Sequence, residues 1–124
     1  MINVKLVYGM SNTEWNTITS VKDLERIHEE SFEYAVMILK HSTSCSVSYM
    51  ALDNLNSEWN DSEICIKKKY ILDLLSYREL SNMISRKYNI IHQSPQVIVL
   101  QNGSPIYENS HFGIKFKNLK NSVC

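Results

Sequence analysis

The sequence predicts an α/β protein with a mixed β-sheet and helices on both of its faces. Apolar runs typical of buried strands alternate with segments of helical spacing, and the last third holds two strand-like runs around Asn102-Gly103, as in an antiparallel hairpin. The length of 124 residues suits one compact domain. We therefore expect a single domain over residues 1–124, in which residues 1–10 form an N-terminal arm or an extra strand.

A helix near residues 20–31 and a strand at Tyr34–Leu39 are the first predicted elements. Ser20 followed by Asp23 resembles a helix start. The side chains that then recur at helical spacing are Val21, Leu24, Ile27, His28 and Phe32. The strand is a continuous apolar run, the pattern of a central strand covered on both faces. Because polar residues 40–44 follow it, we expect the strand to end at Leu39.

A second helix is predicted directly after Cys45. Its apolar side chains form one stripe over about four turns, made of Val47, Ala51, Leu52, Leu55 and Trp59. Cys45 therefore lies where a strand, a polar loop and a helix meet. A strand at Tyr70–Leu75 and a helix near residues 78–88 continue the alternation, and we interpret residues 67–69 as solvated lysines leading into that strand.

The last third of the chain is predicted to complete the sheet. Gln96–Leu100 and Pro105–Glu108 are the two strands of the hairpin. A final stretch at Ile114–Leu119 has weak helical spacing and is interpreted as a terminal helix. Parallel strand–helix–strand units followed by a hairpin and a helix give a mixed sheet covered on both faces.

Composition excludes several classes of function. Thirteen Lys and Arg balance thirteen Asp and Glu, so no overall field attracts nucleic acid or an anionic membrane. No apolar run approaches the roughly 20 residues that span a bilayer, and we expect a cytoplasmic protein without a membrane partner. Three cysteines are an odd number, which argues against a secreted disulfide framework. Without a CxxC, HExxH or Cys/His cluster, we expect neither a metal nor a bound cofactor.

Cys45 is the candidate nucleophile. Unpaired N–H groups and the dipole at a helix start stabilise a thiolate, and thiols at such places reach pKa values of about 3.5–7.5. The charge of Lys40 acts in the same direction, Thr43 belongs to the same polar loop, and Ser48 can direct its hydroxyl at the sulfur. Ser48 stands where a dithiol enzyme has its second cysteine. From position alone, a small packed thiol is an equally supported alternative for Cys45.

Pro95 is the second notable feature, between the third helix and the hairpin. Taken alone, it is most simply a trans proline that begins an edge strand. Cys65 precedes a predicted strand, and its default interpretation is a structural thiol.

Four separated motifs together resemble a known family. In order, they are Lys40–Ser48, Ser76–Asn82, His92–Gln96 and Ser110-His111. They resemble the monothiol bacilliredoxins, the YtxJ family of thioredoxin-like general-stress proteins, from about Trp15 to Leu119. The resemblance implies a thioredoxin-like fold, Cys45 as the nucleophile, and Pro95 as a cis-proline facing it. It also implies bacillithiol, a low-molecular-weight thiol, as co-substrate and bacillithiolated proteins as substrates.

The residues expected to bind the substrate are Arg78, His92, Ser94 and Pro95. Arg78 lies by resemblance on the active-site side with Lys40, and two cations suit an anionic thiol; the alternative is a solvated arginine. His92 is interpreted first as a framework histidine and second as a proton shuttle. The backbone of Ser94, before Pro95, offers an N–H and a C=O to a bound peptide or thiol.

The chain departs from the family motif Thr-Cys-Pro-Ile-Ser at Ser44 and Ser46. The missing proline leaves the helix start less fixed and restores an N–H near the sulfur. Cys124 is a second departure, interpreted as an exposed thiol rather than a resolving cysteine.

The preferred hypothesis is a monothiol thiol–disulfide oxidoreductase. The Cys45 thiolate attacks the outer sulfur of a protein–bacillithiol mixed disulfide, and free bacillithiol, a partner reductase or Cys124 then regenerates it. One alternative is a binding module that captures a peptide beside Pro95. Another is a monothiol protein that holds an iron–sulfur cluster between two subunits. We expect a monomer that binds no nucleic acid.

Overall fold

The structure is a computed structural model that describes residues 14–123 of the chain. The predicted arm or strand at residues 1–10, and Cys124, lie outside these residues. The strands are β1 (Asn16–Thr17), β2 (Ala35–His41), β3 (Ile66–Asp73), β4 (Gln96–Gln101) and β5 (Ser104–Ser110). The helices are α2 (Val21–Glu30), α3 (Ser46–Glu58), α4 (Arg78–Tyr88) and α5 (Phe116–Val123), with single 3-10 turns η1 (Asp61–Glu63) and η2 (His111–Gly113).

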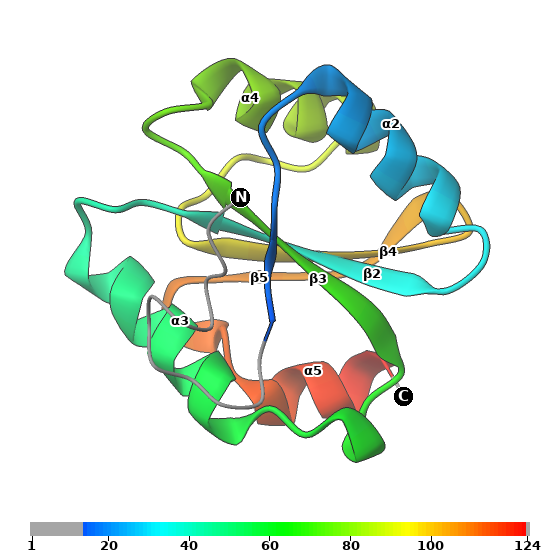
Figure 1. Ribbon diagram of the computed structural model, residues 1–124. Helices are drawn as coiled ribbons and strands as arrows, with labels where there is room; N and C mark the ends of the chain where they lie inside the picture. Colours follow the sequence, from blue (N-terminus) through cyan, green and yellow to red (C-terminus); the bar gives the residue numbers. More distant parts are fainter. Residues whose placement is uncertain (1–13, 124) are drawn as a thin grey trace.

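The strands form one mixed sheet in the order β1-β3-β2-β4-β5. β1 and β2 both run parallel to β3, whereas β4 is antiparallel to β2 and to β5. Helices α2 and α4 cover one face of the sheet, and α3 and α5 cover the other (Figure 1). The predicted α/β class with helices on both faces is confirmed.

The core has two halves because successive side chains of a strand point to opposite faces. In β2, Met37 and Leu39 belong to the half under α3 and α5. Val36 and Ile38 belong to the half under α2 and α4. All seven residues of β2 are buried, as expected for a strand at the centre of a sheet covered on both faces.

Local signals set two of the element boundaries as predicted. The Ser20 hydroxyl accepts a hydrogen bond from Asp23 N at 3.2 Å and caps α2. Asn102 and Gly103 both have positive φ, 54° and 76°, which is the backbone of a two-residue hairpin turn. The turn lies against the end of α2, where Gly103 N donates to Ser31 Oγ at 2.9 Å.

Several boundaries differ from the sequence prediction, and those of β2 and β3 differ because of strand pairing. β2 continues to His41 rather than ending at Leu39, because its register with β3 and β4 includes Lys40. β3 begins at Ile66, so the lysines that we interpreted as a lead-in belong to the strand. The terminal helix runs over Phe116–Val123, later than the predicted 114–119.

Candidate functional site

Cys45 is the N-cap of α3, with an extended backbone at φ −117° and ψ 121°. Its side chain is partly exposed and is a free thiol. The loop before it is tightly turned, because Cys45 N donates to Ser42 O at 3.2 Å. The first turn of α3 contains no acidic residue, so no carboxylate on that turn neutralises the positive end of the helix dipole beside the thiol.

Ser48 is buried beneath the loop that presents Cys45, with 0% of its surface exposed. Its hydroxyl oxygen accepts a hydrogen bond from Ser42 N at 3.0 Å. The same oxygen lies 2.6 Å from Nδ1 of His41, the last residue of β2. The Ser48 hydroxyl therefore joins the end of β2 to the first turn of α3. Its two hydrogen bonds fix the buried side of the loop over residues 42–45.

The Ser94–Pro95 segment lies at the same edge of the sheet. Lys40 pairs with Gln96 in the antiparallel ladder of β2 and β4, so the residues just after β2 and just before β4 are neighbours. The Ser94–Pro95 peptide bond is cis, as the family resemblance implies. Pro95 is buried, and its carbonyl accepts from His111 N at 3.0 Å. The segment is thereby tied to the end of β5.

Gln96 shapes the loop that leads to Pro95, although sequence reasoning did not single it out. Its side chain is fully buried, and Nε2 donates to Ile91 O at 3.0 Å and to Glu108 Oε2 at 3.2 Å. An amide at the start of an otherwise apolar strand was the available signal, because a buried polar side chain needs hydrogen-bond partners.

The sequence hypothesis requires the charge of Lys40 near the Cys45 thiol, on the α3 face of the sheet. The side chain of Lys40 lies on the other face. It follows Val36 and Ile38 in the alternation of β2, and Nζ donates to Ser81 O at 3.1 Å and to Ser85 Oγ at 2.9 Å in α4. Burial, and then the charge of Arg78, lower the pKa of Lys40 to about 8. The ammonium group is thus enclosed under α4.

His92 brings the Pro95 loop into contact with Lys40. The distance between Lys40 Nζ and His92 Nδ1 is 3.3 Å, and Ser81 Oγ lies 3.4 Å from the same nitrogen. Burial lowers the pKa of His92, and the positive charges of Lys40 and Arg78 lower it further. A neutral imidazole suits the framework role that the sequence favours.

Thr43 and Arg78 are both exposed. Thr43 lies in the loop before Cys45, and Arg78 is the first residue of α4. The structure therefore gathers Cys45, Ser48 and the Ser94–Pro95 segment at one edge of the sheet, and it directs Lys40 and His92 toward α4 behind that edge.

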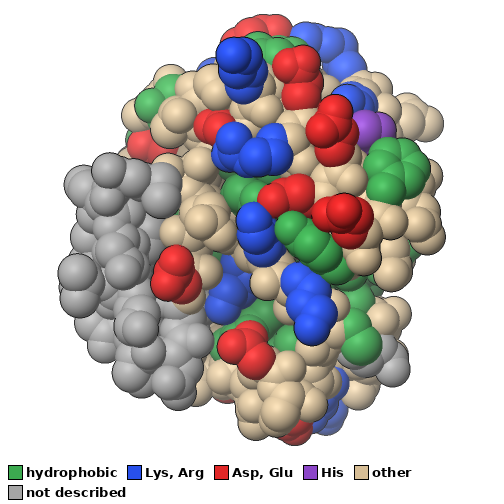
Figure 2. Space-filling view, turned by 45° about the vertical axis from the view of Figure 1, so that its right-hand side comes forward, with side chains coloured by type: hydrophobic (Ala, Val, Ile, Leu, Met, Phe, Trp, Pro, Cys, Tyr) green, Lys and Arg blue, Asp and Glu red, His purple; other side chains and the backbone are tan. Residues whose placement is uncertain are grey.

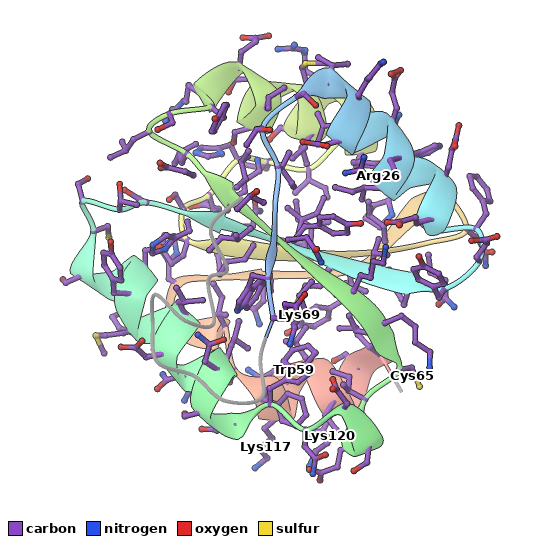
Figure 3. The ribbon with its side chains drawn as sticks, in the orientation of Figure 1. Arg26, Trp59, Cys65, Lys69, Lys117 and Lys120 are labelled. Carbon is purple, nitrogen blue, oxygen red and sulfur yellow. The ribbon has the colours of Figure 1, made fainter. Side chains whose placement is uncertain are left out.

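Cys65 lies at the other end of the parallel strands. It just precedes β3, whereas Cys45 follows the end of β2, and Figure 3 shows Cys65 far from the beginning of α3. Cys65 is disulfide-bonded, which corrects its interpretation as a free structural thiol. Cys45 is thus the one free thiol within residues 14–123.

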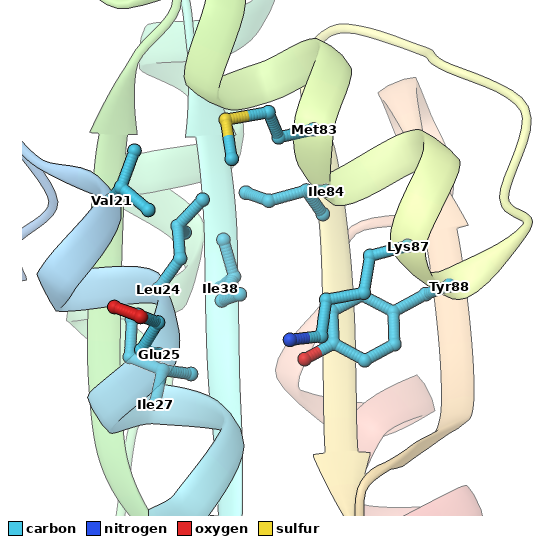
Figure 4. A pocket seen from close by; sticks show the side chains of 9 residues that line it. All are labelled: Val21, Leu24, Glu25, Ile27, Ile38, Met83, Ile84, Lys87 and Tyr88. Carbon is cyan, nitrogen blue, oxygen red and sulfur yellow. The ribbon is translucent and has the colours of Figure 1, made fainter.

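Away from this edge, the described residues line two hollows, a polar one of about 650 Å³ at residues 58–63 and a smaller apolar one. An apolar hollow of about 100 Å³ lies between α2 and α4 (Figure 4), below the roughly 300 Å³ at which ligand pockets begin. Acidic and basic side chains mix on the face shown in Figure 2. Lys68 and Glu30 form an ion pair at 2.7 Å. Within the described range 14–123, no three His, Cys, Asp or Glu side chains are grouped to hold a metal ion, and no helix is long and apolar enough to cross a membrane.

Residues 16–119 match the family described as monothiol bacilliredoxin BrxC. The chain belongs to the monothiol bacilliredoxin family. The description names a monothiol protein, and in this chain a serine, Ser48, stands three residues after Cys45.

Solved structures support the fold of this bacilliredoxin. A thioredoxin-fold protein, provisionally described as an oxidoreductase, is 29% identical with a TM-score of 0.75, over 86% of this chain and 91% of its own. Thioredoxin from Malassezia sympodialis is 14% identical with a TM-score of 0.66, over 90% and 89% of the two chains. Thioredoxin from Fasciola hepatica is 13% identical with a TM-score of 0.67, over 87% and 95%. The bacilliredoxin is a thioredoxin-fold protein of the thiol-redox class.

Proposed function

We propose that this bacilliredoxin removes bacillithiol from proteins through the Cys45 thiol. The observation that carries the proposal is the setting of Cys45, a partly exposed free thiol at the N-cap of α3. At position 48 a serine replaces the second cysteine of a dithiol enzyme, so Cys45 cannot form a disulfide within its own motif. The chemistry then requires a second thiol from outside the motif.

The reaction consists of two thiol–disulfide exchanges. In the first, the Cys45 thiolate attacks the bacillithiol sulfur of a mixed disulfide, a new Cys45–bacillithiol bond forms, and the protein thiolate leaves and takes up a proton. In the second, the thiolate of a free bacillithiol attacks the bacillithiol sulfur on Cys45. Bacillithiol disulfide is released, and Cys45 returns as a thiolate with no net change.

The helix start supports the thiolate form that this chemistry needs. The first N–H groups of α3 and the positive end of its dipole act on Cys45, and no acidic side chain on the first turn opposes them. Lys40 contributes less than the sequence hypothesis assumes, because its ammonium group is enclosed under α4. The exposed Arg78 is therefore the cation that we propose interacts with an anionic low-molecular-weight thiol.

Exposed apolar side chains at this edge suit a protein substrate. Leu75 follows Leu74, whose N–H bonds to His41 O, and Phe112 follows His111, which bonds to Pro95 O. Ile91 lies in the loop that Gln96 holds. All three are exposed and come from three different loops around the site. The backbone of Ser94 remains the proposed contact for the peptide or thiol.

The decisive experiment follows debacillithiolation of a model protein that carries bacillithiol on one cysteine. Cys45→Ser is expected to reduce the rate to that of the uncatalysed reaction, whereas Met50→Ala, an exposed change on the same helix, is expected to leave it unchanged. Mass spectrometry of the wild type during turnover is expected to show one bacillithiol adduct on Cys45. Full activity of Cys45→Ser would refute the proposal.

The same preparation discriminates the other hypotheses. A glutathione mixed disulfide of the same model protein tests the choice of thiol, and equal rates with both would remove the assignment to bacillithiol. A brown protein purified without oxygen, whose dimerisation needs Cys45, would indicate an iron–sulfur cluster. A Cys45 that resists disulfide reagents would leave only a binding module.

A further inference from the structure

His41 is a buried titratable residue that the proposed mechanism does not use. It is the last residue of β2, and only 2% of its surface is exposed. Nδ1 lies 2.6 Å from Ser48 Oγ, while Nε2 is buried and has no hydrogen-bond partner among the residues that the structure describes. The ring also meets Tyr49 edge-on, with the two centroids 4.7 Å apart.

The hydrogen bonds around Ser48 admit two arrangements. A hydroxyl has one hydrogen to donate and two lone pairs that accept, and one lone pair already accepts from Ser42 N. If the Ser48 hydroxyl donates to Nδ1, the proton of His41 is on Nε2, and a buried N–H is left unpaired. If Nδ1–H donates to Ser48 Oγ, only a lone pair on Nε2 is left unpaired.

The second arrangement is the more stable one. Orphaned buried N–H groups are rare in proteins, whereas unpaired acceptors are less uncommon. In this arrangement Ser48 Oγ accepts twice, and its own hydrogen is free to point elsewhere. Cys45 is the N-cap and Ser48 the third residue of α3, so the two residues lie about one helical turn apart, and the Cys45 side chain makes no capping hydrogen bond in this structure.

We propose that His41 is a positioning residue for the Cys45 thiolate: its Nδ1–H donates to Ser48 Oγ, and the Ser48 hydroxyl is thereby left to donate to Cys45 Sγ. The proposal rests on the proposed function in that Cys45 reacts as a thiolate. In this proposal Ser48 has two roles, because it fixes the loop over residues 42–45 and donates a hydrogen bond to the thiolate. The neutral serine then replaces the second cysteine of a dithiol site as a hydrogen-bond donor.

The surroundings of His41 are compatible with a neutral ring. Burial lowers the pKa of His41, and the nearby carboxylates of Asp73 and Asp53 act in the opposite direction. Asp73 lies at the end of β3, and its carboxylate is already bonded to Leu75 N at 3.1 Å and to Ser76 Oγ at 2.9 Å. Asp53 lies on the exposed side of α3.

The first test measures how alkylation of Cys45 by iodoacetamide depends on pH. Ser48→Ala is expected to move the pH midpoint of alkylation up by about one, because a hydrogen bond to the thiolate is lost. His41→Phe, which fills the same space without a hydrogen bond, is expected to move it in the same direction. His41→Asn, whose amide can donate from the position of Nδ1, is expected to restore most of the wild-type midpoint.

The double variant shows whether His41 acts through Ser48. His41→Phe in the Ser48→Ala background is expected to cause no further change, because the hydroxyl that His41 orients is gone. An equal upward change in both backgrounds would overturn the proposal, and so would a wild-type midpoint in His41→Phe. Circular dichroism of each variant checks that the fold is kept.

The second test is made on the wild-type protein, and a variant serves only to assign the signal. Nitrogen-15 NMR of the wild type distinguishes the protonated ring nitrogen from the bare one, and His41→Asn assigns the signal among the four histidines. The proposal expects the proton on Nδ1. A proton on Nε2 would overturn it. Both tests observe the thiol and the imidazole directly, so a failure to act on bacillithiol would leave their results standing.

Discussion

Lys40 and Lys69 are buried lysines on the neighbouring strands β2 and β3, yet their ammonium groups have different surroundings. Lys40 Nζ contacts oxygen and nitrogen atoms of α4 and of His92, next to the Pro95 loop. Lys69 Nζ lies 4.4 Å from the centroid of the Trp59 ring, at the opposite end of α3 from Cys45 (Figure 3). Burial lowers the pKa of both to about 8.

The difference distinguishes the Cys45 end of α3, which adjoins the Pro95 loop, from its Trp59 end. At the Cys45 end, buried polar groups are connected by directional hydrogen bonds, and such bonds fix the positions of loops. At the Lys69 end, the lysine rests on aromatic rings that also pack against each other, with Trp59 and Phe116 centroids 5.2 Å apart. That contact is strong but less directional. We therefore expect changes at the first end to alter reactivity, and changes at the second to alter stability.

Truncation of Trp59 has the largest expected effect. Trp59→Ala removes a buried ring and its N–H bond to Asp61 Oδ1, and it should lower the free energy of unfolding by about 3–5 kcal/mol. Urea denaturation measures the loss. Met50→Ala, exposed on the same helix, should change it by less than about 0.5 kcal/mol. A small loss in Trp59→Ala would show that this end is not the stabilising one.

The free energy of unfolding should increase as the pH is raised from about 8 to 10.5. Each of Lys40 and Lys69 has a pKa of about 8 in the folded protein and an ordinary value of 10.5. In that range the unfolded chain binds more protons than the folded one, so raising the pH favours folding. Tyr70 and Tyr88, whose pKa values burial raises to about 12, act in the opposite direction above about pH 10. The urea midpoint should therefore be followed from about pH 7.5 to about pH 9.5.

Lys40→Met and Lys69→Met should each reduce the increase of the free energy of unfolding with pH. If both single variants showed the same increase as the wild type, the pKa assignments would be contradicted.

Lys40→Met should also slow thiol exchange, by about tenfold, because His92 loses a contact and the Ser94–Pro95 segment is less firmly placed. Lys69→Met should leave the rate of the folded protein unchanged. The rate with a bacillithiolated model protein measures both. Equal rates of thiol exchange in Lys40→Met and Lys69→Met would contradict the assignment of reactivity to the Cys45 end and of stability to the Lys69 end.

Lys68→Met should have the smallest effect, although Lys68 is the sequence neighbour of Lys69. Its side chain is exposed and forms an ion pair with Glu30 at 2.7 Å. Exposed pairs contribute about 0–1 kcal/mol, so the loss of unfolding free energy should stay below about 1 kcal/mol. The rise between pH 8 and 10.5 should persist, because the pKa of Lys68 is raised rather than lowered. A loss as large as that of Trp59→Ala would show that exposure does not separate the two lysines.

Much of the site could be predicted because its signals are local. Cys45 at a strand-to-helix junction follows from the apolar run before it and the stripe after it, and the hairpin follows from Asn102-Gly103. The junction at Cys45 and the hairpin turn both depend on residues that are close in the sequence. The alternation in β2 also contained an unused signal, because His41 continues the series that faces α3, and a polar residue there needs a partner.

Lys40 shows why the rest could not be predicted. Its contacts with Ser81 and His92 join residues that are 41 and 52 positions apart in the chain. Whether β2 ends at Leu39 or continues to His41 depends on pairing with β3 and β4. Because Lys40 is paired within β2, the alternation of side chains along the strand directs its ammonium group to the face covered by α4. The sequence therefore places a polar loop where the structure has a buried lysine.

The order of the elements and the cysteine at a helix start were readable in the amino-acid sequence, since each depends on periodicity or capping within a few residues. The partners of Lys40, His41 and Gln96 came from the folded chain, since a buried polar group bonds to whatever the packed sheet and helices bring within about 3 Å.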